Sequence, residues 1–119
     1  MAVGSFLFMT IDCLDPDGLA TFWAEVLGSE IDLVMDDGRY VFLKGSDTLP
    51  VLCFQRVPEA KVEKNRLHLD VSVEDLGAAT DRIVELGGSW TDGVDRQLED
   101  VTWRTMADPE GNEFDIEVG

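Results

Sequence analysis

Hydrophobic and polar residues alternate along several short stretches of the chain, and one of these stretches contains the single histidine. In RLHLDVSVEDL, leucine and valine alternate with His68, Asp70, Ser72 and Glu74. A period of two is typical of a strand that has one buried and one exposed face. The pattern therefore predicts a strand over Leu67–Val73, with the imidazole beside an aspartate on the polar face.

The second half of the chain repeats the pattern of the first half at an offset of 60. FMTIDCLDPDGLATFWAEVLGS, which starts at Phe8, aligns without a gap on HLDVSVEDLGAATDRIVELGGS, which starts at His68. Each stretch predicts a strand and then a helix with an apolar stripe at helical spacing. Acidic caps begin the helices at Asp15 and Asp75, and glycines end them at Gly28 and Gly87. The repeat predicts two related modules.

Strands are also expected after each helix. The first predicted strand is Phe6–Cys13, and the strands after the helices are Glu30–Met35, Arg39–Lys44 and Val51–Val57 in the first half and Ser89–Asp92, Val101–Ala107 and Glu113–Val118 in the second. Turns are expected at Asp36–Gly38 and at Asp108–Asn112. The sequence thus predicts a single α+β domain over 1–119, with βαβββ modules at 1–57 and 65–119 joined by the linker 58–64.

Composition and charge restrict the partners. The formal net charge of −16 repels phosphate backbones and anionic lipid, so we expect no nucleic acid and no membrane as partners. Such a field gathers cations, including cationic small molecules, although acids on solvated faces, which confer solubility or adaptation to salt, better explain most of the charge. The N-terminus lacks the pattern of a secretory signal, and Cys13 and Cys53 lack metal-site spacing. These features predict a cytoplasmic protein with reduced thiols.

Three stretches resemble the vicinal oxygen chelate superfamily, in particular its glyoxalase-like and bleomycin-resistance-like members. They are IDCLDPDGLATFWAEVLG, KNRLHLDVSVEDLGAATDRIVELGG and ADPEGNEFDIE. The resemblance implies two βαβββ modules that form a curved mixed sheet with a concave cleft. It also implies homodimers, and a metal or small-molecule site in the cleft. Enzymes of the superfamily include lyases, isomerases and dioxygenases.

The resemblance also indicates where a metal would bind. The offset of 60 pairs Phe8 with His68 and Gln55 with Asp115, and it implies that these four side chains converge around a shared hollow. His68, Asp115 and Gln55 offer nitrogen or oxygen donors, whereas the ring of Phe8 has no lone pair to give. We therefore expect either no cofactor or a weakly bound divalent metal. His68 beside a carboxylate is also the candidate catalytic residue for proton transfer.

Three classes of function remain open from the sequence. The first is a metal-free binding protein, whose cleft sequesters a small organic molecule such as a cationic toxic compound. The second is a metal-dependent enzyme that uses His68 and Asp115, and the third is an interaction module with a vestigial cleft. The predicted ligand-binding residues are Phe8, Thr10, Asp12, Gln55, His68, Asp70, Trp103 and Asp115.

Overall fold

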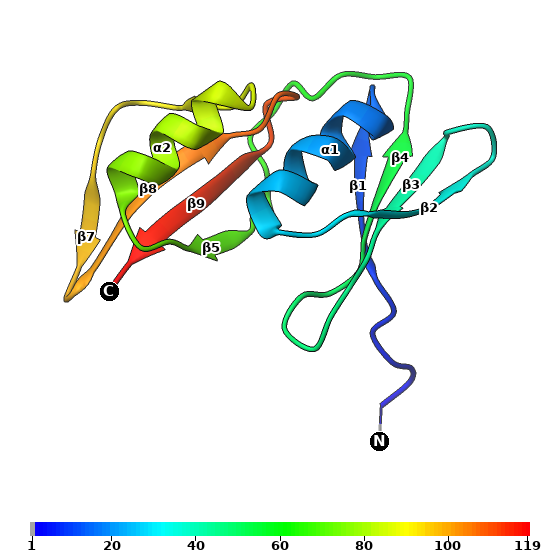
Figure 1. Ribbon diagram of the computed structural model, residues 1–119, viewed down its shortest axis with the longest axis horizontal. Helices are drawn as coiled ribbons and strands as arrows, with labels where there is room; N and C mark the ends of the chain where they lie inside the picture. The colour runs from blue at the N-terminus through cyan, green and yellow to red at the C-terminus, as the bar shows by residue number, and fades with distance from the viewer. Residues whose placement is uncertain (1) are drawn as a thin grey trace. The chain divides into compact units, whose positions relative to one another are not determined.

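The structure is a computed structural model that describes residues 2–119, and it divides into two compact units (Figure 1). The first unit ends at Ala60 and the second begins at Lys61, inside the segment predicted to link the modules. Each unit has one helix and its own mixed sheet. Among the described residues, neither helix is long and apolar enough to cross a membrane.

The first unit has a four-stranded sheet in the order β1-β4-β3-β2. Its elements are β1 (Met9–Cys13), α1 (Pro16–Leu27), β2 (Ile31–Met35), β3 (Tyr40–Leu43) and β4 (Leu52–Arg56). Strands β1 and β4 are parallel, and the other two pairs are antiparallel. The β2–β3 hairpin turns at Asp36–Gly38, where all three residues have positive φ. Strands β1 and β2 are therefore the edges of this sheet.

Helix α1 covers one face of the first sheet. The Asp15 carboxylate accepts a hydrogen bond from the Gly18 backbone N–H (3.1 Å), and Gly28 ends the helix with φ of 68°. The buried side chains of the helix and of the strands beneath it form the core of this unit; they include Leu19, Phe22, Trp23, Val41, Leu43, Leu52 and Phe54. Because this face is filled, the opposite face of the sheet is the one open to a ligand.

The second unit repeats the arrangement with one additional strand. Its elements are β5 (Asp70–Ser72), α2 (Leu76–Glu85), β6 (Ser89–Trp90), β7 (Arg96–Leu98), β8 (Val101–Ala107) and β9 (Glu113–Val118). The sheet order is β5-β9-β8-β6, and β7 also pairs with β8. Ile83 of α2 is buried, as are Met106, Phe114 and Ile116 of the sheet. As in the first unit, the helix leaves the opposite face of the sheet open.

The predicted α+β class and the two modules are confirmed, with differences at the strand ends. The first strand of each module is shorter than predicted: β1 lacks Phe6–Phe8 and β5 lacks Leu67–Leu69 and Val73. The parallel partner of β1 begins only after Pro50, which has no N–H to donate, so residues 6–8 have no strand to pair with. Strand β7 was not predicted.

Candidate binding and metal sites

The open face of the first sheet contains a pocket with a volume of about 310 Å³. Its lining residues are Phe8, Thr10, Met35, Tyr40, Phe42, Cys53 and Gln55. The rings of Phe8 and Phe42 meet edge to face, with 5.2 Å between their centroids. A pocket of this size with aromatic walls and a few uncharged polar groups is typical of small-molecule sites.

The register of the sheet brings these residues together. Thr10 pairs with Cys53, and Cys53 pairs with Phe42 on the other side. Directly paired residues on neighbouring strands project to the same face, so these three side chains form one row across the sheet. A second row contains Asp12, Gln55 and Tyr40. Because β4 lies between β1 and β3, it supplies the centre of the pocket.

The thiol of Cys53 is uncharged at neutral pH. Burial raises the pKa of Cys53, and a hydrogen bond with Thr10 offsets only part of that effect. The residue is buried and forms no disulfide, and the same is true of Cys13. The prediction that both thiols are buried is therefore confirmed, and Cys53 acts in the pocket as a small polarisable group rather than as a nucleophile.

The open face of the second sheet carries a different set of residues. His68, Asp70 and Asp115 each offer one donor atom, and the three atoms lie within 4.8 Å of one another. His68 Nδ1 is 3.2 Å from Asp70 Oδ1 and 3.9 Å from Asp115 Oδ2. The side chains of His68 and Asp70 are 44% and 51% exposed, whereas that of Asp115 is only 18% exposed. The cluster is therefore anchored at Asp115 and open to solvent at the other two residues.

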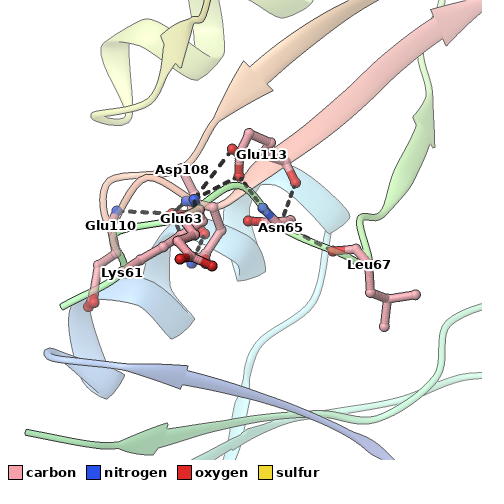
Figure 2. Close-up of polar contacts among 8 residues, drawn as sticks. Lys61, Glu63, Asn65, Leu67, Asp108, Glu110 and Glu113 are labelled. Carbon is pink, nitrogen blue, oxygen red and sulfur yellow. Dashed lines mark hydrogen bonds and ion pairs between the residues drawn. The ribbon is translucent and has the colours of Figure 1, made fainter. Parts of the chain in front are cut away.

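Two neighbours hold Asp115 and His68 in place. The Thr105 hydroxyl donates a hydrogen bond to Asp115 Oδ1 (2.8 Å), which leaves Oδ2 directed toward the imidazole. The segment that leads to His68 is fastened to the start of β9, as Figure 2 shows. There the Asn65 side-chain amide donates to the backbone oxygens of Glu113 (3.0 Å) and Leu67 (3.1 Å). These contacts position the imidazole although it lies outside β5.

Glu113 completes this fastening through an ion pair. Its carboxylate lies 3.0 Å from Lys61 Nζ and accepts a hydrogen bond from the Asn65 backbone N–H (3.3 Å). Burial raises the pKa of Glu113, but the hydrogen bonds and the positive charge of Lys61 together outweigh burial and lower it. The ionised form of Glu113 is therefore the one that the fold favours.

The two ladders show which positions of the modules correspond. Thr10 pairs with Cys53 in the first sheet, and its repeat partner Asp70 pairs with Asp115 in the second. By strand register, Cys53 is thus the counterpart of Asp115, and the pairing of Gln55 with Asp115 from the constant offset is wrong. The offset increases from 60 at the first strand to 62 at the last. At the same sheet positions, one module presents apolar and uncharged groups and the other presents possible metal ligands.

The second cluster fits a divalent ion. One imidazole and two carboxylates form a nitrogen and oxygen donor set suited to manganese, iron or zinc. Metal–ligand bonds of about 2.0–2.2 Å place neighbouring donors roughly 3–4 Å apart, which agrees with the two distances from His68 Nδ1. The high exposure of His68 and Asp70 argues for a site that exchanges its ion readily.

The predicted site residues thus divide between the units. The structure brings Phe8, Thr10 and Gln55 together in the first unit and His68, Asp70 and Asp115 in the second. Asp12 pairs with Gln55 but does not line the pocket. Trp103 pairs with Glu117, which is two residues after Asp115 on β9. The convergence of Gln55 with His68 and Asp115 stays a prediction.

Several residues of both sites were not anticipated from the sequence. In the first unit these are Met35, Tyr40 and Phe42, and in the second unit Thr105. The period of two along β8 places Thr105 and Trp103 on one face, and this pattern would have identified Thr105. The pocket residues of β2 and β3 required the register of the hairpin, which the sequence does not specify.

The fold and the arrangement of the sites define a glyoxalase-type protein. The model of the glyoxalase-like domain family matches residues 8–117, so the chain belongs to this family. The predicted resemblance to the vicinal oxygen chelate superfamily is thereby confirmed. Comparison with curated proteins gives no match.

Solved structures with the same fold have low sequence identity. The E126Q mutant of the fosfomycin resistance protein FosX from Listeria monocytogenes, in complex with Mn(II) and a dihydroxypropylphosphonic acid, has a TM-score of 0.77 at 16% identity, with 100% of this chain and 92% of that chain covered. A glyoxalase-related enzyme from Fulvimarina pelagi has a TM-score of 0.72 at 19% identity, with 98% and 89% covered. FosX from Mesorhizobium loti has a TM-score of 0.71 at 16% identity, with 100% and 94% covered.

Proposed function

We propose that this glyoxalase-like protein binds a small organic molecule without a tightly held metal and sequesters it, as resistance-like members do. The observation that carries the proposal is the pocket of about 310 Å³ on the open face of the first sheet. A vestigial face filled by its own side chains would leave no such volume. The pocket therefore favours a binding protein over a pure interaction module.

The test is a thermal-shift screen with a variant in which the pocket is blocked. The panel contains uncharged aromatic compounds, amines, antibiotics and adducts of α-ketoaldehydes with thiols. We expect at least one class to raise the melting temperature of the natural protein, because a ligand that binds only the folded state stabilises it. Thr10→Phe should abolish that rise, because the exposed Thr10 lines the pocket from the edge strand β1.

The matched control is Ser72→Phe, an exposed residue on the edge strand β5 of the other module. This variant should keep the ligand-induced rise, and circular dichroism checks that both variants fold. If no class shifts the melting temperature, or if both variants lose the shift equally, the binding proposal is refuted.

A metal-dependent enzyme is the second candidate, and the cluster of His68, Asp70 and Asp115 favours it. The likeness to a FosX structure with bound Mn(II) points the same way. A divalent ion held by these side chains would supply a Lewis acid that polarises an oxygen of the substrate. With the ion bound, the three side chains would serve as its ligands, and the activity would be of the lyase, isomerase or dioxygenase type.

Metal analysis of protein purified without chelator separates the two candidates. Under the first proposal, the content of manganese, iron, zinc and nickel stays far below one ion per chain. Near-stoichiometric metal that is lost in His68→Ala and Asp115→Asn, together with metal-dependent turnover, would establish the enzyme instead. Asp12→Asn is the control, because this exposed aspartate lies outside the cluster.

We further propose that the protein is a cytoplasmic homodimer that does not bind nucleic acid or membranes. Cys13 and Cys53 are buried and neither forms a disulfide, which is consistent with a reducing compartment. The exposed apolar strand β2 is consistent with a second copy as partner. The acids on the open face of the second sheet favour a cation there, either a metal ion or an amine.

A further inference from the structure

The pocket of the first module is uncharged in a chain that is strongly charged elsewhere. The chain has 25 acidic and 9 basic residues, yet none of the residues that line this pocket, within 2–119, carries a charged side chain. Its polar groups are the hydroxyls of Thr10 and Tyr40, the thiol of Cys53 and the amide of Gln55. Burial raises the pKa of Cys53, so the thiol adds no negative charge near neutral pH.

Charged residues of both signs stand beside residues that line the pocket. Asp12 shares the sheet row of Gln55 and Tyr40, and the Arg39 guanidinium lies 5.9 Å from the centroid of the Tyr40 ring. A second cation at this ring would meet the charge of Arg39, and an anion would meet the charge of Asp12. A charged guest would also lose its hydration against the surfaces of Phe8 and Phe42 without gaining an ion pair.

The walls of the pocket suit a planar ring. Phe8 and Phe42 meet at an interplanar angle of 81°, so a guest placed against one ring face lies edge-on to the other. Aromatic pairs favour this edge-to-face arrangement and the offset-stacked one. Met35 adds a thioether, which makes favourable contacts with ring edges. An engineered apolar cavity of roughly 150 Å³ admits benzene, so about 310 Å³ has room for a substituted ring.

Resting on the proposed binding function, we propose that this pocket selects an uncharged aromatic ring that bears one hydrogen-bonding substituent. The ring lies against Phe8, Phe42 and Met35, and the substituent contacts the amide of Gln55. The corresponding sheet positions in the second module carry Asp70 and Asp115 in place of Thr10 and Cys53. The two open faces therefore have different preferences, and cations belong to the second one.

The test compares three ligands of nearly equal size: benzyl alcohol, benzylammonium and benzoate. Binding is followed by the ¹³C-methyl NMR signal of Met35, which lines the pocket, while Met106 in the core of the second unit serves as an internal reference. We expect benzyl alcohol to shift the Met35 signal with an affinity at least ten times that of either ion. The Met106 signal should stay in place.

A charge introduced at the pocket should reverse this order. In Gln55→Glu the new carboxylate should make benzylammonium the best of the three ligands. Gln97→Glu, which makes the same change at an exposed position of β7, should leave the order unaltered.

The possible failures of the test are distinct. If benzylammonium or benzoate binds the natural protein as tightly as benzyl alcohol, selection for an uncharged ring is refuted while the binding function stands. If Gln55→Glu leaves the order unchanged, Gln55 does not contact the substituent and the proposal fails. If no ligand of any class shifts Met35 or the melting temperature, the binding function fails as well.

Discussion

At the scale of single residues, the position of His68 depends on Glu113, which is not one of the three donor residues of the second site. His68 precedes β5 and has no strand partner of its own. Glu113 and Asn65 fasten the chain just before it to the start of β9. Glu113 is therefore a positioning residue: its carboxylate affects the geometry of the His68, Asp70 and Asp115 side chains indirectly.

Replacing Glu113 should weaken the fold at neutral pH and have little effect in acid. The pKa of Glu113 is lowered in the folded protein, so its ionised form stabilises the fold above its ordinary pKa of 4.5. That stabilisation is lost as the pH falls through the lower, folded-state pKa. We expect Glu113→Gln to reduce the free energy of unfolding by about 1–2 kcal/mol at pH 7, because the charge-assisted bonds are lost. Urea titrations at pH 7 and below pH 3 measure the difference.

The exposed Glu74 provides the control for this experiment. Glu74→Gln should change the free energy of unfolding by less than about 0.5 kcal/mol at either pH. A loss in Glu113→Gln that is equally large in acid would show that shape rather than charge fastens the segment.

At the scale of secondary-structure elements, the local pattern was sufficient for the helices. Both caps, Asp15 and Asp75, accept a hydrogen bond from the backbone N–H of the third helical residue. The helical stripes and the stopping glycine Gly28 also lie where the sequence places them. These features depend on neighbours within one or two turns, and a single sequence contains that information.

Strand register depends on partners far along the chain, and the errors occurred there. A period of two shows that Gln55 and Cys53 share a face, but it does not show which of them pairs with β1. The observed register places Cys53 opposite Thr10, so a constant offset misassigned the counterpart of Asp115. The donor residues of the second site were still predicted, because His68 stands two residues before Asp70 and the period of two places both on one side of the chain, although His68 itself precedes β5.

At the scale of the whole molecule, charge and apolar surface have opposite effects on association. Two copies that each carry a net charge of −16 repel each other. Strand β2 nevertheless leaves Ile31, Leu33, Val34 and Met35 exposed at a sheet edge. An uncovered apolar edge strand is a site at which another chain can pair.

This balance predicts a dimer whose fraction increases with salt concentration. A single charge introduced on β2 should prevent the dimer from forming. Raising NaCl from about 0.05 to 0.5 M shortens the screening length to a few Å, so sedimentation velocity should show a larger dimer fraction. Val34→Lys should abolish the dimer at both salt concentrations, because it places a charge on the exposed apolar strand. Val84→Lys makes the same change on α2 at nearly equal exposure, 52% against 53% for Val34, and should leave the dimer intact. A dimer that persists in Val34→Lys would place the interface away from β2, and a dimer that dissociates with salt would show that attraction between charges holds it together.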